Sequence, residues 1–150
     1  MADAKTRLQQ EMREALKAGE KLRLGALRML AASVKNREVE LGHELSDGEL
    51  VEVATREVKR RKEAAEAFDG GGRPELAEKE RQEQAVLEAY LPAQLSDKEV
   101  GALIDEAIRT TGASGPGDLG KVMGFVMGRA KGRVDGGTVN RLVRDRLASG

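Results

Sequence analysis

The chain of 150 residues contains no cysteine, no tryptophan, one histidine, one tyrosine and two phenylalanines. Without cysteine it can form no disulfide and offers neither a thiolate nucleophile nor a sulfur ligand for a metal. The single histidine, His43, lies in a turn signal and makes a zinc site or a Ser-His-Asp triad hard to build. We therefore expect no catalytic residue, no metal and no cofactor.

The sequence also lacks an apolar run long enough to span a bilayer and an N-terminal apolar block that would direct secretion. Basic and acidic residues number 26 each, so the formal net charge is zero. Such a balance gives no overall attraction to nucleic acid or to a membrane. We predict a cytoplasmic protein with no membrane partner, in which binding of a polyanion requires a local concentration of charge.

Charged residues make up 35% of the chain, and apolar residues recur at the three- and four-residue spacing of amphipathic helices. Glycines, prolines and capping residues divide the sequence into seven helical segments, and nothing reads as a strand. The predicted helices start at about Asp3, Lys21, Ser46, Pro74, Ser96, Pro116 and Asp135. The fold class predicted is therefore all-α.

The linker at Leu91–Leu95 follows the end of the fourth predicted helix, which Pro92 terminates. We predict an N-terminal helical unit of about four helices over residues 1–91, joined to a C-terminal three-helix unit over residues 95–150. Charge is unevenly shared, because residues 1–91 carry 17 basic and 19 acidic side chains. From Lys121 onward there are 7 basic residues and 2 acidic ones, a net charge of +5 in a neutral protein.

Two nucleotide-binding motifs overlap in the C-terminal unit, but their surroundings exclude both. Glycines at 115, 117 and 120 match Gly-x-Gly-x-x-Gly, and Gly115–Lys121 matches the start of a phosphate-binding loop. Each motif needs a strand leading into the glycine loop, whereas the preceding segment has helical periodicity. Val122 also stands where the phosphate loop needs serine or threonine to hold magnesium.

Three glycines recur at every fourth position of the sixth predicted helix: Gly120, Gly124 and Gly128. Glycine inside a helix costs roughly 1 kcal/mol relative to alanine, so three of them need a physical reason. The reason is close approach of another backbone, either a neighbouring helix or the phosphates of a partner. We favour helix–helix packing inside the C-terminal unit.

Basic residues follow these glycines at the end of the same helix. Arg129, Lys131 and Arg133 surround Gly132, and Lys121 lies near the start of that helix in the same basic segment. Cations on a turn beside the start of a helix suit a phosphate backbone. Equally, Arg129 and Lys131 complement the negative end of the helix dipole.

Two groups of cations in the N-terminal unit receive different interpretations. The run Lys59–Lys62 wraps around its helix among several glutamates, so we interpret it as a solvated, locally paired surface. Arg28, Lys35 and Arg37 lie among apolar neighbours, where a long side chain packs its stem and presents its charge. These three are the candidates for interaction with a protein partner.

Short motifs spread along nearly the whole chain resemble the YqeY family. They are Leu27–Leu30, Val34–Asn36, Tyr90–Pro92 with Leu95 and Ser96, Gly120–Gly124, Lys131–Arg133 with Asp135 and Gly136, and Val139–Asn140. The C-terminal unit also resembles the tail of the GatB subunit of the tRNA-dependent amidotransferase. The resemblance implies a two-part all-α fold and a link to carbon–nitrogen ligases that use glutamine as amido donor.

In the amidotransferase the similar tail contacts tRNA, while catalysis takes place elsewhere. The resemblance thus implies that Lys121, Lys131, Gly132 and Arg133 lie nearest to RNA. Where that tail commonly has Ala-Asn-Pro, this chain has Val134–Gly136, which places an acidic residue beside the contact. We predict an accessory module, not catalytic by itself, that binds tRNA or associates with the amidotransferase. The alternative is a protein-interaction module that uses the N-terminal unit to bind a protein of the translation or amidotransferase machinery, with no nucleic-acid role.

Overall fold

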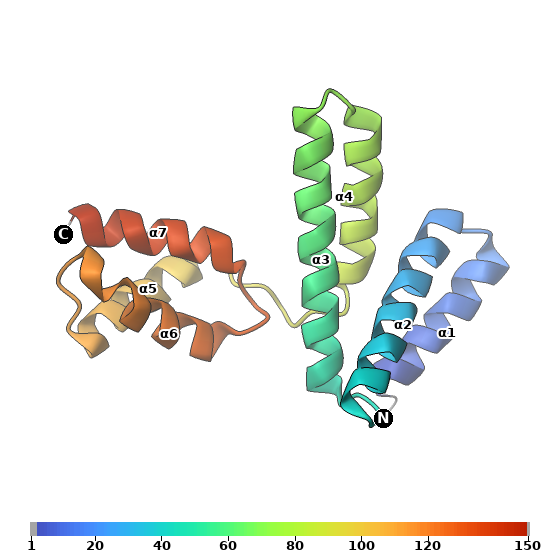
Figure 1. Ribbon diagram of the computed structural model, residues 1–150, viewed down its shortest axis with the longest axis horizontal. Helices are drawn as coiled ribbons and strands as arrows, with labels where there is room; N and C mark the ends of the chain where they lie inside the picture. The colour runs from blue at the N-terminus through green and yellow to red at the C-terminus, as the bar shows by residue number, and fades with distance from the viewer. Residues whose placement is uncertain (1–2, 150) are drawn as a thin grey trace. The chain divides into compact units, whose positions relative to one another are not determined.

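A computed structural model of the chain describes residues 3–149. Over these residues the chain forms seven α-helices and one short 3-10 helix, and no strand, so the prediction of an all-α fold is confirmed (Figure 1). The elements are α1 (Ala4–Ala18), α2 (Lys21–Leu41), α3 (Asp47–Gly70), α4 (Pro74–Glu88), α5 (Asp97–Thr111), η1 (Pro116–Asp118), α6 (Leu119–Ala130) and α7 (Gly136–Ser149). The chain divides after Leu91 into two compact units, Met1–Leu91 and Pro92–Gly150.

Two helix boundaries differ from the sequence prediction. The fourth helix, predicted to continue to Leu91 just before Pro92, ends at Glu88. The Tyr90 and Leu91 N–H groups bond to carbonyls three residues back, so the backbone forms a tighter turn ahead of Pro92. Pro116 begins a 3-10 turn, and α6 follows from Leu119. In both places a proline fixes the local backbone, but the pattern of apolar residues does not reveal which turn results.

α3 and α5 start near Ser46 and Ser96, as predicted, and each begins with a capping box. The Ser46 hydroxyl accepts from the Glu49 N–H at 3.2 Å, and the Glu49 carboxylate accepts from the Ser46 N–H at 3.0 Å. Ser96 and Glu99 make the same pair of bonds, at 3.1 Å each. These side chains satisfy N–H groups that the first turn of a helix leaves without a partner.

Lowering the pH is expected to destabilise the protein through these two glutamates. The pKa of Glu49 and that of Glu99 lie below the ordinary value, chiefly because each carboxylate accepts the backbone N–H of its capping serine. A carboxyl group whose pKa is lower in the folded state contributes stability above its unfolded pKa and loses it as the pH falls through the folded pKa. We expect the Tm to be steady from about pH 7 to about pH 5 and to fall below about pH 4.

Circular dichroism melting of the wild type and of a Glu49→Gln, Glu99→Gln variant checks this expectation. The amide keeps an acceptor for the serine N–H but does not titrate, so the variant should lose less of its Tm between about pH 5 and about pH 3. An equal loss in both proteins would assign the acid sensitivity to other carboxylates.

The N-terminal unit consists of two helical hairpins, α1 with α2 and α3 with α4 (Figure 1). Its core is a cluster of aliphatic side chains, among which Leu27, Leu30, Leu50 and Leu87 are fully buried. Tyr90 closes this core after the end of α4, and burial raises the pKa of its phenol. The apolar part of the interior is therefore aliphatic except for one ring, as expected from the composition.

Tyr90 also connects the segment after α4 to α1 and α2. The Arg7 guanidinium lies 4.5 Å from the centroid of the Tyr90 ring, a cation–π contact. Glu11 pairs with Arg7 at 2.6 Å and with Arg23 at 3.1 Å, joining the two helices of the first hairpin. The tyrosine of the Tyr90–Pro92 motif therefore has a structural role at the end of this unit.

The C-terminal unit packs α5, α6 and α7 around a second aliphatic core. Ile104 of α5, Val122 and Val126 of α6, and Val139 and Val143 of α7 are fully buried in it. Asp135 caps α7 as predicted, because its carboxylate accepts from the Thr138 N–H and hydroxyl. Within residues 3–149, no helix is both long and apolar enough to cross a membrane.

Candidate functional site

The turn between α6 and α7 holds the residues that the sequence assigned to RNA contact, and its backbone is tied to the preceding linker. Gly132 has a positive φ of 78°, a conformation that glycine adopts without strain. Its carbonyl accepts from the Gln94 side chain at 2.8 Å. The carbonyl of Arg133 accepts from the Leu95 N–H at 2.9 Å, and Arg133 Nε donates to the Ala93 carbonyl at 2.9 Å.

These bonds give two of the candidate residues a structural function. Through these hydrogen bonds, Gly132 and Arg133 hold residues 93–95 against the α6–α7 turn, inside the C-terminal unit. Arg133 also lies near the start of α5, where its charge contributes to the lowered pKa of Glu99 after the Ser96 hydrogen bonds. Substituting Arg133 would therefore disturb the turn as well as any RNA contact.

The other three candidate cations of this segment differ in their ion pairing and in their exposure to solvent. Arg129 pairs with Glu106 at 2.8 Å and lies 4.5 Å from the centroid of the Phe125 ring. The Lys121 ammonium lies 3.6 Å from Asp118, with 67% of its side chain exposed, which is a weak surface pair. Lys131 is exposed at the C-terminal end of α6.

The three α6 glycines are exposed and do not touch another helix of the C-terminal unit. A Cβ atom built at Gly120, Gly124 or Gly128 would meet no atom within 4 Å apart from the helix itself. The face of α6 that packs on its neighbours carries Val122 and Val126. The interpretation of these glycines as positions of helix packing inside the C-terminal unit is therefore wrong, because the valines fill that role.

The glycines instead form a bare strip of helix with lysines at its margins. At about 100° per residue, Gly120, Gly124 and Gly128 span an arc of about 80° on α6. Lys121 borders that arc, and Lys131 follows at the C-terminal end of the helix. We call the five residues the glycine face of α6.

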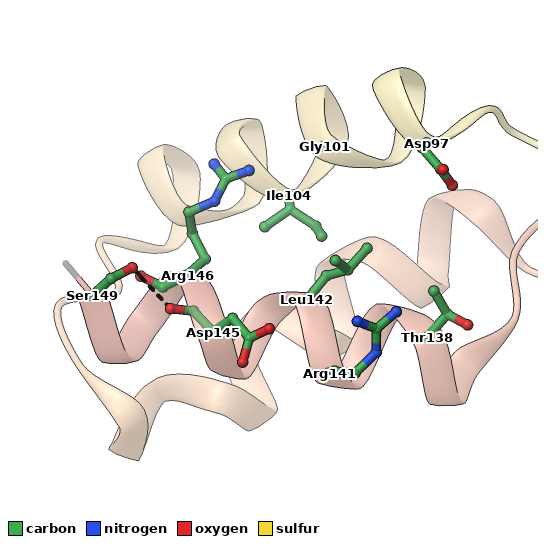
Figure 2. Close-up of a pocket in the computed structure, with 9 residues that line it drawn as sticks. All are labelled: Asp97, Gly101, Ile104, Thr138, Arg141, Leu142, Asp145, Arg146 and Ser149. Carbon is green, nitrogen blue, oxygen red and sulfur yellow. Dashed lines mark hydrogen bonds between the residues drawn. The ribbon is translucent and has the colours of Figure 1, made fainter.

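A hollow between α5 and α7 lies elsewhere on the C-terminal unit (Figure 2). Ile104 and Leu142 supply its apolar surface, while Asp97, Asp145 and Arg141 contribute opposite charges to its lining. Arg146 also lines it and forms an ion pair with Asp105. Because these charges oppose each other, the hollow gives little attraction to a polyanion.

The N-terminal interaction candidates separate into two groups. Arg28 and Lys35 both lie on α2 beside α1, and each lines a hollow between the two helices. Arg37 lies away from these hollows and pairs with Glu40 at 2.9 Å. The structure therefore brings two of the three candidates to one surface.

The N-terminal unit contains a buried ionic cluster that was not predicted from the sequence. Arg61 is only 4% exposed and pairs with Glu57 of the same helix and, at 3.6 Å, with Glu83 of α4. Glu57 also accepts from the Ser33 hydroxyl of α2, and Arg61 Nη2 lies 3.2 Å from the Met29 sulfur. The interpretation of Lys59–Lys62 as a solvated surface is wrong for Arg61.

A signal for this burial is present in the sequence. Glu57 and Arg61 lie on the apolar stripe of α3 that runs through Leu50, Ala54 and Ala65, at steps of three and four residues. A charged pair at four-residue spacing within such a stripe indicates a buried pair. The periodicity of the stripe, more than the count of charges, was the informative feature.

Nowhere in residues 3–149 do three or more histidine, aspartate or glutamate side chains gather in an arrangement suited to a metal ion.

The fold and the surfaces define an all-helical protein of two units, with an open glycine face on α6 and hollows between α1 and α2. The sequence model described as Yqey-like protein matches residues 5–147, and the chain belongs to the YqeY family.

Two curated relatives share the name "Altered inheritance of mitochondria protein 41, mitochondrial". The protein of Pyrenophora tritici-repentis is 27% identical over 143 residues, which cover 93% of this chain and 78% of the relative. The protein of Eremothecium gossypii is 29% identical over 92 residues, which cover 61% of this chain and 50% of the relative. Because both are named as mitochondrial, they contradict the prediction of a cytoplasmic location.

Proposed function

We propose that this protein is an accessory module, not catalytic by itself, that binds tRNA through the glycine face of α6. The observation that carries the proposal is the exposure of Gly120, Gly124 and Gly128 with no neighbour from the other helices of the C-terminal unit. Each of these glycines lowers helix stability, and no contact within that unit accounts for them. An external backbone that approaches the bare helix would account for all three.

A phosphate backbone fits this surface better than a set of bases. The glycine face offers close approach with the ammonium groups of Lys121 and Lys131 at its margins, which suits phosphate contact. The chain has only Phe68, Tyr90 and Phe125 as aromatic residues, too few for stacking on successive bases. Recognition would therefore depend on backbone and shape, as it does for structured RNA.

The electrostatics of the C-terminal unit also support the proposal. The net charge from Lys121 onward is +5. Arg141 and Arg144 of α7 are exposed, and neither has an ionic or hydrogen-bonding partner within residues 3–149. A local excess of cations attracts a polyanion even where the protein as a whole is neutral. Association with a tRNA-dependent amidotransferase belongs to the same proposal and rests on the resemblance of this unit to the GatB tail.

A Lys121→Ala, Lys131→Ala variant tests the RNA site. We expect its affinity for bulk tRNA to fall on the order of tenfold, measured by fluorescence anisotropy at several salt concentrations. The slope of log affinity against log salt should fall by about 0.7–0.9 for each lysine that contacts a phosphate. We avoid Arg133, because its bond to the Ala93 carbonyl makes any loss ambiguous.

The matched control removes two exposed cations of α5 through Lys98→Ala and Arg109→Ala. Both variants change the net charge equally, so a purely global charge effect would weaken them equally. If the two variants bind alike, or if the lysine variant binds as wild type does, the glycine face is not the RNA site.

A further inference from the structure

A groove runs along one side of the α1–α2 hairpin in the N-terminal unit. One hollow, of about 300 Å³, is lined by Gln9, Met12, Arg13, Leu16, Leu24 and Arg28. A second, of about 310 Å³, lies toward the other end of the hairpin and is lined in part by Ala31 and Lys35. The two hollows adjoin each other at Gln9, which lines both. We call this surface the hairpin groove.

The floor of the hairpin groove is apolar and accessible. Leu16 is 60% exposed, one of three large hydrophobic side chains that are exposed in the described chain. Met12 and Leu24 lie beside it in the same hollow. An exposed leucine with a half-buried methionine beside it, in a concave surface, is typical of a site that receives apolar side chains from a partner.

The rim of the groove is basic, although the N-terminal unit as a whole carries a net charge of −2. Arg13, Arg28 and Lys35 are exposed, and none of them has an ion pair or hydrogen bond among residues 3–149. The one carboxylate in the lining, Glu38, already accepts from Lys5 at 2.9 Å and from the Leu45 N–H at 2.9 Å. The cations are therefore available to an acidic partner.

We propose that the hairpin groove binds an acidic amphipathic helix of a partner protein. A helix that lies between α1 and α2 would place apolar side chains, spaced at three, four and seven residues, over Leu16, Met12 and Leu24. Its flanking glutamates or aspartates would reach the three cations, which gives charge complementarity across the groove. RNA would leave the apolar floor uncovered, so the floor favours a protein helix over a nucleic acid. This surface is independent of the glycine face of α6.

The test uses the full chain and three labelled helix-forming peptides of about 18 residues, or five turns. The first has leucines on one face and glutamates on its flanks. The second replaces the glutamates by lysines, and the third has the composition of the first with the leucines scrambled off one face. Fluorescence anisotropy measures the affinity of each peptide for the wild type and for two variants.

The groove variant is Arg28→Glu, Lys35→Glu, and its matched control is Arg56→Glu, Lys79→Glu. All four positions are exposed, and neither control position lines the groove, so the two variants carry the same charge change at different places. We expect the acidic peptide to bind the wild type at least about tenfold more tightly than the lysine or scrambled peptide. The groove variant should lose on the order of tenfold in affinity for it, while the control stays close to wild type.

Several outcomes would overturn the proposal. They are failure of the acidic peptide to bind, equal binding of acidic and lysine peptides, and equal affinity of the two variants. If no peptide binds but tRNA binding depends on Arg28 and Lys35, the groove is a site for a polyanion. If instead binding to phosphatidylserine vesicles depends on them, the groove is a site for a membrane surface. Melting curves of both variants confirm that a loss of affinity does not reflect unfolding.

Discussion

Replacing Arg61 by alanine is expected to destabilise the N-terminal unit by about 3–5 kcal/mol. The substitution removes the cation between two buried carboxylates, those of Glu57 and Glu83, which are 5% and 9% exposed. A buried carboxylate without its partner bears the cost of leaving water with no compensating attraction. The loss is large relative to the total stability of a small domain, so partial unfolding at room temperature is expected.

Urea denaturation followed by circular dichroism measures this effect, with Arg60→Ala as the neighbouring control. The Arg60 side chain is 75% exposed and lies 3.6 Å from Glu57, so its removal should cost less than about 1 kcal/mol. If Arg60→Ala and Arg61→Ala lower the free energy of unfolding by similar amounts, burial does not determine how much each arginine contributes to stability.

Removing all three charges together should cost much less than removing the arginine alone. In an Arg61→Met, Glu57→Gln, Glu83→Gln variant none of the three charges remains, and the amide oxygen introduced at position 57 still offers an acceptor to the Ser33 hydroxyl. Replacement of a buried ion cluster by well-packed hydrophobic residues of similar volume is often close to neutral, and neutral amides likewise leave no unpaired buried charge. A triple variant as unstable as Arg61→Ala would show that the ion pairs themselves, more than the unpaired charge, hold the unit together.

The cluster connects three helices, which gives it a role in specifying their arrangement. Arg61 belongs to α3, Glu83 to α4, and Ser33 and Met29 to α2. An aliphatic core tolerates small shifts of one helix along another, whereas directed polar bonds have one satisfied geometry. The α3–α4 hairpin and α2 therefore share a polar contact that fixes their register.

Much of the fold followed from the sequence because its signals are local. A serine three positions before a glutamate, as at Ser46 and Ser96, defines a helix start through two hydrogen bonds within one turn. A glycine after a run of apolar periodicity, as at Gly19 or Gly42, ends a helix in a left-handed conformation. Such features depend on neighbours in the chain and need no knowledge of tertiary contacts.

The candidate sites were less predictable because their properties depend on contacts between distant residues. Nothing in the sequence near Arg133 indicates that its side chain bonds the carbonyl of Ala93, 40 residues away. The glycine spacing in α6 favoured helix packing over contact with a partner, and only the position of Val122 and Val126 in the core of the C-terminal unit shows that the glycines lie on the other side of the helix. Arg28 and Lys35 were grouped as interaction candidates from their own helix, but the hollows beside them require α1.

Replacing Gly120, Gly124 and Gly128 together by alanine is expected to make the C-terminal unit more stable and to weaken RNA binding. Each alanine adds a methyl group into open space on α6, so no clash opposes the gain in helix propensity. The gain is about 0.5–1 kcal/mol for each position and about 2 kcal/mol for the three together. Three methyl groups would hold a phosphate backbone away from the helix, and we expect affinity for tRNA to fall on the order of tenfold.

The matched control is Gly101→Ala in α5, outside the glycine face. A Cβ atom there meets only Arg146 Nη2 at 3.9 Å, an ordinary contact, so this variant should also gain stability. It should bind tRNA as the wild type does, which separates an effect of the α6 surface from an effect of helix stability.

A stabilised triple variant that binds tRNA normally would show that the glycines are not part of the RNA site. A destabilised one would mean that the face is covered in solution by something that tolerates no side chain. Stabilisation combined with lost binding is the outcome that requires an external backbone, because a residue kept for the fold alone would not behave in this way.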